Sequence, residues 1–262
     1  MAVEKQPVPL SLAEVESTTI LRCEVGSTVH GLGVAGTDDR DELGICIEPK
    51  DYVIGLRHFE QYTYRSQAQG VRSQPGDLDL TIYGLRKFAS LALKGNPSIL
   101  LLFNVPDEKC IVRSTVGDQL RRDAWKFASK KAGAAFLGYM QQQRQRLMGE
   151  RGQMNVKRPE LIEQYGFDTK YAGHIIRLGF QGIDYMTTGA FPIPMPDEQR
   201  ELILAIRTGL IDQNAVLTKA GELEQEMKAA IDSSALPDAP NYAAVNDLLI
   251  ASYQRVWREG IA

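Results

Sequence analysis

Residues 19–47 read TILRCEVGSTVHGLGVAGTDDRDELGICI, and this stretch decides the fold. Apolar and polar side chains alternate well enough through Thr19–Val25 to predict a β-strand, which Gly26-Ser27 ends. A short helix or turn with several glycines follows. The acidic run Asp38–Glu42 then leads into the apolar Leu43–Ile47, which predicts a second strand. We therefore interpret the stretch as two strands joined by a glycine-containing corner, with carboxylates where the second strand begins.

The remaining sequence divides into a strand-containing part and a mostly helical part. Asp77–Tyr83 alternates and predicts a third strand, which runs into an amphipathic helix at Leu85–Leu93, and residues 50–76 indicate a short helix and a loop. Further helices are expected at Ile99–Phe103, Gln119–Met148, Pro159–Gln164, Thr169–Thr187, Glu198–Arg207, Leu217–Ser233 and Ala243–Trp257. We expect an α+β protein with a small core of mixed sheet and helices at residues 1–105 and a helical domain at 106–262.

The composition excludes several classes of protein. The chain has 262 residues, of which 44% are hydrophobic, so it can bury a sizeable core. No window approaches the roughly 18 apolar residues of a membrane span, and the start MAVEKQPVPL lacks a signal-peptide pattern, so we expect a cytoplasmic protein without a membrane partner. The three cysteines make neither a disulfide framework nor a zinc site, and Cys46 and Cys110 resemble ordinary core residues.

The net charge of −3 argues against a protein coated in nucleic acid, but the charge is unevenly distributed. Residues 109–158 hold twelve basic and three acidic residues, whereas residues 197–238 hold four basic and nine acidic ones. The basic segment also carries the aromatic residues Trp125, Phe127, Phe136 and Tyr139. Basic and aromatic side chains together suit an RNA backbone with stacked bases. The alternative is an amphipathic helix with aromatic residues in the core, and the pattern favours it for the aromatic side chains themselves.

A glycine motif within the opening stretch points to a different function. Gly31–Gly36 matches G-x-G-x-x-G, which is typical of dinucleotide-binding folds. Its glycines begin five residues after Gly26 rather than at the strand end, and a strand follows them where such folds have a helix. Dinucleotide binding is therefore disfavoured.

The carboxylates indicate a metal site. Asp39 and Asp41 are two residues apart in an extended segment, so their side chains point to the same face, and Asp79 on the third strand completes a trio. Adjacent carboxylates stay ionised only if a cation neutralises their charge, and three oxygen ligands suit Mg²⁺. The alternative is a solvated turn at Asp38–Glu42, which would be favoured for the pair alone.

The corner Gly26-Ser27 changes that balance. Backbone N–H groups and a hydroxyl at a strand-to-helix corner can bind a phosphate. A strand, Gly-Ser, a helix, Asp-x-Asp on the next strand and Asp on a third strand resemble the nucleotidyltransferases of the DNA polymerase β superfamily. This resemblance implies a polymerase β-like core followed by a helical domain.

The resemblance extends over nearly the whole chain to one branch, the predicted nucleotidyltransferases associated with RNA ligases and RNA repair. The similar motifs are Gly26-Ser27-x-x-x-Gly31-Leu32, Asp39-x-Asp41-x-x-Gly44-Ile45, Tyr83-Gly-Leu-Arg-Lys-Phe88, Lys94-Gly-Asn-Pro97, Phe136-Leu-Gly-Tyr139, Lys157-Arg-Pro-Glu160, Tyr165-Gly-Phe-Asp-Thr-Lys170, His174-x-x-Arg177-Leu178 and Ala205-Ile-Arg-x-Gly209. The sequence departs from the branch by one inserted residue near Thr37 and by Leu101, where a glutamate is usual. The second departure implies an altered acceptor site or a lost structural carboxylate.

The helix that begins at Thr169 carries a polar face. Lys170, His174, Arg177 and Gln181 are spaced by four, three and four residues, which places them on one side of the helix. Lysine and arginine on such a face suit a triphosphate. A solvated polar face is the alternative, and it would be favoured without the aspartates.

Together these features predict a nucleotidyltransferase that moves an NMP from an NTP to a hydroxyl and releases pyrophosphate. Gly26, Ser27, Lys170, His174 and Arg177 are expected to bind the triphosphate. Asp39, Asp41 and Asp79 are expected to act in catalysis and to hold two Mg²⁺ ions, with Mn²⁺ as a substitute. Asp79 is the expected base for the acceptor hydroxyl.

The family resemblance implies an RNA 3′ end as the acceptor, bound through residues 109–158. Two alternatives stay open. The acceptor could be a protein side chain or a small molecule, or the chain could be a catalytically silent RNA- or nucleotide-binding module. The sequence does not indicate an oligomeric state.

Overall fold

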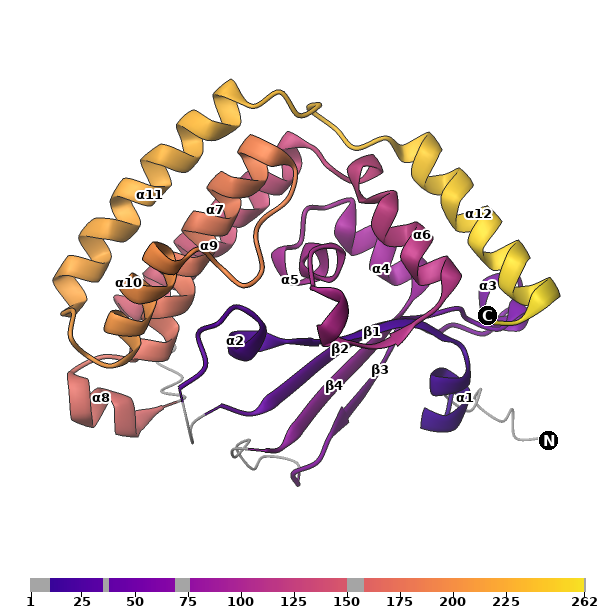
Figure 1. Cartoon of the computed structure of the whole chain (residues 1–262), viewed down its shortest axis with the longest axis horizontal. Helices are drawn as coiled ribbons and strands as arrows, with labels where there is room; N and C mark the ends of the chain where they lie inside the picture. The colour runs from indigo at the N-terminus through magenta and orange to yellow at the C-terminus, as the bar shows by residue number, and fades with distance from the viewer. Residues whose placement is uncertain (1–9, 35–37, 69–75, 150–157, 262) are drawn as a thin grey trace, which may run out of the picture.

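The computed structural model describes residues 10–34, 38–68, 76–149 and 158–261. The first half of the chain contains a five-stranded sheet of order β3-β4-β2-β1-β5 (Figure 1). Its strands are β1 Thr19–Val25, β2 Arg40–Cys46, β3 Gln61–Arg65, β4 Leu78–Gly84 and β5 Cys110–Arg113. Only β2 and β4 run parallel, and every other neighbouring pair is antiparallel. The protein is thus a mixed α/β protein with a mixed sheet and many helices, as the sequence predicted.

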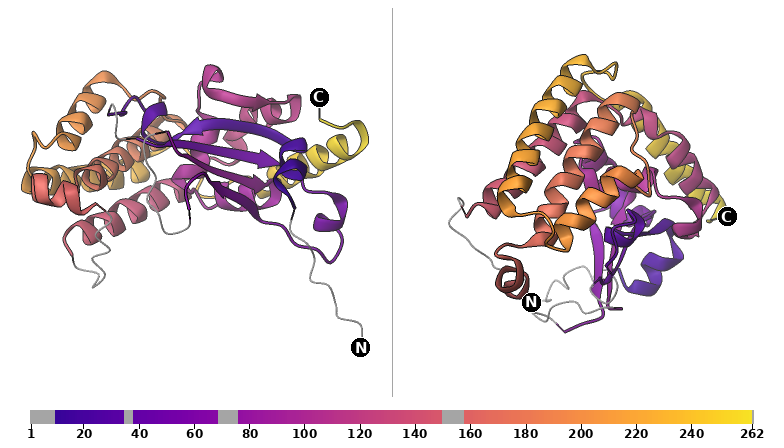
Figure 2. Two further views of the ribbon diagram at one scale, coloured as in Figure 1. Left: turned by 90° about the horizontal axis from the view of Figure 1, so that it is seen from below. Right: turned by 60° about the vertical axis from the view of Figure 1, so that its left-hand side comes forward.

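Helices cover both faces of the sheet. Apolar side chains of the strands point to both sides and pack against them. Ile45 and Ile47 join the main hydrophobic core, under the helices α4 Leu85–Ala92, α5 Pro97–Leu100 and α6 Thr115–Arg122. Cys46, between them, points the other way and packs in a smaller cluster with residues of α1 Leu12–Ser17 and α3 Lys50–Val53. Figure 2 shows the sheet from below, with the larger helical layer on one side.

A second group of helices lies beyond the end of the sheet where β1 ends and β2 begins (Figure 1). Its central helix, α9 Thr169–Thr188, packs against α7 Lys130–Leu147, α10 Asp197–Arg207 and α11 Gln213–Ser233. The close packing depends on a small residue. A Cβ atom at Gly182 of α9 would lie 2.5 Å from Met227 Cε and 2.8 Å from Phe136 Cβ. The short helix α8 Pro159–Tyr165 precedes α9.

The C-terminal helix α12 Tyr242–Glu259 returns to the sheet side of the molecule. Tyr253 donates a hydrogen bond of 2.7 Å to Glu48 Oε2, and Trp257 Nε1 donates one of 2.9 Å to the Glu48 carbonyl. The same Glu48 carboxylate accepts the N–H of Leu85 at the start of α4. The domain boundary expected at residue 105 would assign strand β5 and helix α12 to the helical domain. Both elements nevertheless contact the part of the protein that contains the sheet.

Three secondary-structure predictions were wrong. Residues 50–76 contain the strand β3, whose side chains are nearly all exposed, so no apolar alternation marked it. The short edge strand β5 was missed for a similar reason. The helix predicted over Gln119–Met148 is interrupted: α6 ends at Arg122, the 3₁₀ turn η3 Ala124–Lys126 follows, and α7 begins at Lys130. The two further 3₁₀ turns are η1 Leu101–Phe103 and η2 Asp107–Lys109, and α2 spans Gly26–Val29.

No helix in the described part of the chain is long and apolar enough to cross a membrane.

Candidate active site

Three aspartates meet where β2 and β4 begin. Asp41 on β2 is the direct register partner of Asp79 on β4, and Asp39 lies two residues before Asp41. Carboxylate oxygens of these three residues all lie within 4.8 Å of one another. The trio predicted from spacing is thus brought together by the parallel pairing of the two strands.

The Gly26-Ser27 corner touches this cluster. Gly26 has a φ of +78°, a left-handed conformation that favours glycine, and a Cβ there would lie 2.3 Å from Asp41 Oδ2. Any side chain at this position would therefore collide with the carboxylate. The corner continues into α2, so the strand-to-helix geometry expected for phosphate binding is present.

A cavity of about 330 Å³ joins the corner to α9. Its lining includes all five predicted nucleotide-binding residues together with Asp41: Gly26, Ser27, Lys170, His174 and Arg177. Gln181, which has the same helical spacing, is buried and contacts His30 instead. Tertiary packing thus brings the α9 face to a corner more than 140 residues earlier in the chain, as its polar pattern suggested.

Two arginines in the cavity were not predicted as site residues. Arg158 pairs with Asp168 at 3.0 Å, and Arg207 of α10 pairs with Asp38 at 3.0 Å. Arg207 lies in the motif Ala205-Ile-Arg-x-Gly209, but its spacing alone gave no sign that it faces the corner. Lys170 also contacts Asp38, at 3.0 Å, and lies 3.7 Å from Asp39.

Asp38 holds the corner and the helices together, a role that the acidic run did not reveal. Burial opposes its ionisation, but the Val34 N–H, Lys170 and Arg207 outweigh that effect and lower the pKa of Asp38. Asp38 is thus a structural anion beside the three clustered aspartates.

Arg65 of the unpredicted strand β3 holds Asp79. Its Nε and Nη2 donate to the two carboxylate oxygens at 2.9 and 3.1 Å, and Gln67 Nε2 donates to Oδ1 at 3.1 Å. Arg65 and Asp79 are register partners, which explains this forked contact. The contacts fix the orientation of the Asp79 carboxylate.

Arg177 differs from the other cations of the cavity. Lys170, Arg158 and Arg207 each pair with an aspartate, whereas in the described part of the chain Arg177 forms no ion pair and contacts His174 Nδ1 at 2.8 Å. Burial and the nearby Arg207 lower the pKa of Arg177 to about 10, and burial with Arg177 and Arg158 lowers that of His174 to about 3. At neutral pH the site thus holds a charged guanidinium beside a neutral imidazole.

The surroundings of Asp41 disfavour its negative charge. Burial, followed by the charges of Asp39 and Asp79, raises its pKa to about 6. A partly buried carboxylate that repels two neighbours fits a cation site, because a divalent ion would remove that repulsion. The donor set is all carboxylate oxygen, which suits Mg²⁺ or Mn²⁺.

The comparison with protein families decides the family. Residues 5–251 match the model of the RNA repair pathway DNA polymerase beta family. The chain belongs to this family. A nucleotidyltransferase-like protein from Exiguobacterium sibiricum is a structural neighbour at 12% identity, with 82% of this chain and 69% of that chain covered and a TM-score of 0.29. A comparison with curated proteins gives no match.

As a member of this polymerase β-like family, the chain has one departure that the structure can place. Leu101, where the resemblance implies a glutamate, lies in η1 with only 7% of its surface exposed and packs in the main core. It does not line the cavity that contains Asp41. The inserted residue near Thr37, the glycine Gly36 and residues 150–157 of the basic segment lie outside the described residues.

Proposed function

We propose that the protein is a divalent-metal-dependent nucleotidyltransferase that moves an NMP from an NTP to a hydroxyl acceptor. The observation that carries the proposal is that Asp41 belongs both to the aspartate cluster and to the lining of the cavity that contains Arg177. A cation site and an anion site thus adjoin at one residue, which suits a substrate that consists of a metal-bound polyphosphate.

The cavity provides binding groups for a triphosphate. Arg177 interacts electrostatically with Asp41 but forms no ion pair in the described residues, so a phosphate oxygen would supply a direct partner. Lys170 and Arg207 contribute further positive charge, although both also hold Asp38. Gly26 and Ser27, at the start of α2, also line the cavity, where backbone N–H groups and the Ser27 hydroxyl could donate to a phosphate.

Asp39, Asp41 and Asp79 would hold the metal, and their geometry and charge fit it. When bound, Mg²⁺ would neutralise the polyphosphate and lower the pKa of a coordinated hydroxyl. Asp79 does not line the cavity and lies beside the exposed strand β3. Asp79 would take the proton of the acceptor hydroxyl as the hydroxyl oxygen attacks the α-phosphate. The cations of the cavity would stabilise the charge of the departing pyrophosphate.

RNA is the acceptor that we favour. The family description refers to RNA repair, and the described part of residues 109–158 is rich in lysine and arginine. A protein side chain or a small-molecule hydroxyl would need the same metal and triphosphate chemistry, so only the acceptor separates these alternatives.

An incorporation assay tests the proposal. The protein is incubated with Mg²⁺ and each α-phosphate-labelled NTP, with an RNA 3′-hydroxyl end, a 3′-deoxy end, a DNA end, or no nucleic acid. We expect label on the 3′-hydroxyl RNA only, and none with Asp41→Asn. Asp51→Asn is the matched control, because Asp51 is an exposed aspartate paired with Arg57 outside the cluster. Full activity of Asp41→Asn, or no incorporation into any acceptor by the parent protein, would overturn the proposal.

A further inference from the structure

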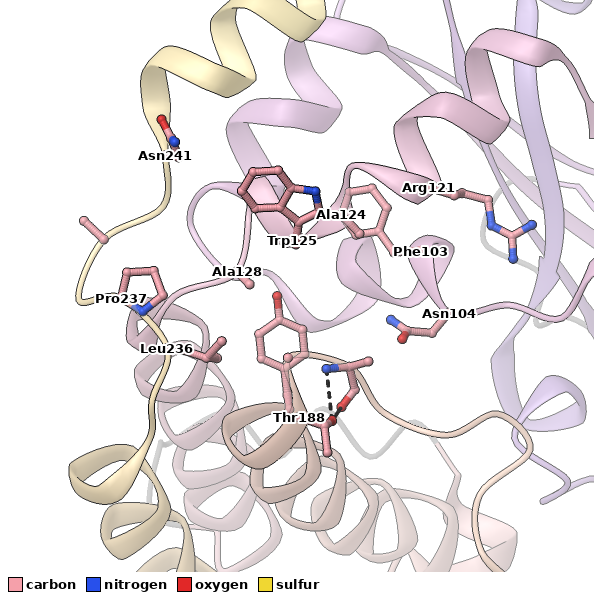
Figure 3. Close-up of a pocket in the computed structure, with 14 residues that line it drawn as sticks. Phe103, Asn104, Arg121, Ala124, Trp125, Ala128, Thr188, Leu236, Pro237 and Asn241 are labelled. Atoms are coloured by element: carbon pink, nitrogen blue, oxygen red, sulfur yellow. Dashed lines mark hydrogen bonds between the residues drawn. The ribbon is translucent and has the colours of Figure 1, made fainter.

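A second cavity, of about 860 Å³, shares no lining residue with the first (Figure 3). Four segments far apart in the sequence line it: the end of η1, the η3 region, the C-terminal end of α9 and the linker between α11 and α12. Most of its lining is apolar or aromatic, and it contains no carboxylate. Its size lies within the range of pockets for small organic molecules, and its lining does not suit a metal ion.

Trp125 on the wall of this cavity is unusually exposed. The side chain is 64% exposed, although the neighbouring Phe127 is fully buried. Figure 3 shows the indole ring at the cavity, near Phe103 and Ala124. The sequence favoured a core position for the aromatic residues of this segment, and that prediction holds for Phe127 and Phe136 but is wrong for Trp125 and Tyr139. A large aromatic surface left accessible at a cavity indicates a ligand with a flat apolar face.

The surroundings of Trp125 are positively charged. Residues 119–131 contain five basic residues and one acidic residue. The Lys126 ammonium lies 5.7 Å from the centre of the Trp125 ring, and Lys126 also pairs with Asp123 at 3.1 Å. An exposed aromatic ring among basic side chains is the combination that binds single-stranded nucleic acid, because the base stacks while the phosphates are neutralised.

Polar groups in the cavity could contact the edge of a base. Asn241 Oδ1 accepts the N–H of Ala244 as the cap of α12. The side-chain nitrogen Nδ2 of Asn241 has no hydrogen-bond partner among the described residues. Thr188 also lines the cavity. Side chains of this kind provide hydrogen bonds at the edge of a stacked base.

The two cavities lie at different points of one helix. Arg177 of α9 lines the first cavity and Thr188 lines the second, eleven residues later. At the rise of an α-helix this is about 16 Å. We propose that the second cavity binds an unpaired base of the RNA acceptor, upstream of the 3′ end that reacts at the aspartates. This inference rests on the proposed function, whose acceptor it places.

Tryptophan fluorescence tests this proposal directly, because the chain has only two tryptophans. Trp257→Phe leaves Trp125 as the single reporter and leaves the second cavity intact. We expect a short single-stranded RNA to quench this fluorescence, and a blunt duplex of the same sequence to quench it far less. Trp125→Ala should weaken binding of the single strand by roughly 5- to 150-fold, the effect of losing one stacked base. Trp125→Tyr should restore most of the affinity.

Leu56→Ala is the control for these variants, since Leu56 is fully exposed and lies outside both cavities. Equal quenching by duplex and single strand, or unchanged RNA affinity in Trp125→Ala, would overturn the inference. The assay needs no turnover, so it is independent of the incorporation test. Quenching without incorporation would count against the proposed function alone, whereas incorporation with an unchanged KM for RNA in Trp125→Ala would count against this inference alone.

A second inference comes from two cysteines and is independent of the first. Cys23 on β1 and Cys110 on β5 are register partners, and their sulfur atoms lie 3.0 Å apart. Residues directly opposite in an antiparallel pair have Cα separations that fall within the range of a disulfide. The structure assigns these residues as a thiol pair that a hydroperoxide oxidises to a disulfide.

The two thiols are unequal. Cys23 is completely buried, whereas Cys110 is partly exposed, contrary to the core position expected for it. Arg121 Nη1 lies 3.7 Å from Cys110 Sγ. The hydrogen bond from Cys23, followed by the charges of Arg121 and Arg113, lowers the pKa of Cys110. Cys110 is therefore the thiol that a peroxide reaches and the better thiolate.

The chemistry balances as a two-electron oxidation. The Cys110 thiolate attacks a peroxide oxygen, the O–O bond breaks, and an alcohol or water leaves, so that Cys110 becomes a sulfenic acid. The Cys23 sulfur then attacks Cys110 Sγ, the S–O bond breaks, and the hydroxide leaves as water with the Cys23 proton. Two thiols are oxidised and one hydroperoxide is reduced.

Mass spectrometry of the whole chain after treatment with hydrogen peroxide tests this inference. We expect a mass lower by two hydrogen atoms, a Cys23–Cys110 linked peptide, and reversal by dithiothreitol. Cys46→Ser should behave as the parent, because Cys46 is buried elsewhere. Cys23→Ser, or Cys23→Ala if the serine variant does not fold, should instead gain oxygen at Cys110. Absence of the linked peptide from the oxidised parent chain would overturn the assignment, as would an equal loss of two hydrogen atoms in Cys110→Ser.

Discussion

Asp41 and Asp79 face each other across the only parallel strand pair of the described sheet, and Asp39 lies close enough to bring all three carboxylates within 4.8 Å. Parallel pairing places the starts of β2 and β4 at the same end of the sheet. The corner after the antiparallel strand β1 ends at that point too, so Gly26 meets Asp41. The aspartate cluster and the Gly26-Ser27 corner therefore meet at one carboxylate, that of Asp41.

This arrangement predicts a gain in stability when the Asp41 charge is removed. Asp41→Asn should raise the free energy of unfolding by about 1 kcal/mol in the presence of EDTA, because a partly buried charge that repels two neighbours is lost. Urea denaturation measures the difference, with Asp51→Asn as the control. The same variant should lose Mg²⁺-dependent NTP binding. A clear loss of stability instead would show that Asp41 is not under electrostatic strain.

Arg177, which forms no ion pair in the described part of the chain, predicts a specific effect on triphosphate binding. Arg177→Gln should weaken NTP binding about 10- to 100-fold, since a charged hydrogen bond of roughly 1.5–3 kcal/mol is lost, and should leave binding of the nucleoside unchanged. Calorimetry with the NTP and with the nucleoside separates the two effects. Arg57→Gln is the control, because Arg57 is exposed and lies outside the cavity. An equal loss for nucleoside and triphosphate would contradict a phosphate contact.

A substitution at Gly26 should cost free energy of folding for two reasons, the left-handed backbone conformation and the close contact with Asp41. Gly26→Ala should destabilise the protein by about 2 kcal/mol or more, because it combines a left-handed conformation with a collision at Asp41 Oδ2. Gly166→Ala has a similar φ of +82° but open space at the Cβ position, so it should cost only about 1 kcal/mol. Thermal or urea unfolding measures both. Equal costs would show that the close approach to Asp41 does not constrain this position.

The buried His30 predicts how stability depends on pH. Burial, followed by the charges of Arg177 and His174, lowers the pKa of His30 well below 6.5, whereas the unfolded chain takes up a proton near that value. The unfolded state then binds more protons, so stability is full above about pH 6.5 and falls as the pH drops below it.

The slope of the free energy of unfolding between pH 7 and pH 5 measures this effect. His30→Gln should reduce the slope, which is at most about 1.4 kcal/mol per pH unit for one group. His174 acts in the same direction, so some slope should remain. His58→Gln is the control, because the side chain of His58 is 70% exposed and lies outside both cavities. An unaltered slope in His30→Gln would contradict the account.

The local features of this protein could be predicted from its amino-acid sequence. Spacing placed Asp39 and Asp41 on one face and indicated the strand that carries Asp79, and helical periodicity aligned Lys170, His174 and Arg177. Each is a relationship within a few residues, where strand or helix geometry dictates the direction of the side chains. The same local rules failed for β3 and β5, because exposed edge strands lack the apolar alternation that marks a half-buried strand.

Which of these residues contact one another depends on the tertiary structure. Pairing with β3 brings Arg65 to Asp79, and the packing of α9 and α10 against the corner brings Arg177 and Arg207 into one cavity with Asp41. It also separates Asp38, held by Lys170 and Arg207, from the neighbouring Asp39. These contacts join residues far apart in the chain. They depend on which apolar faces pack together and how the strands are ordered, information that no local pattern of residues contains.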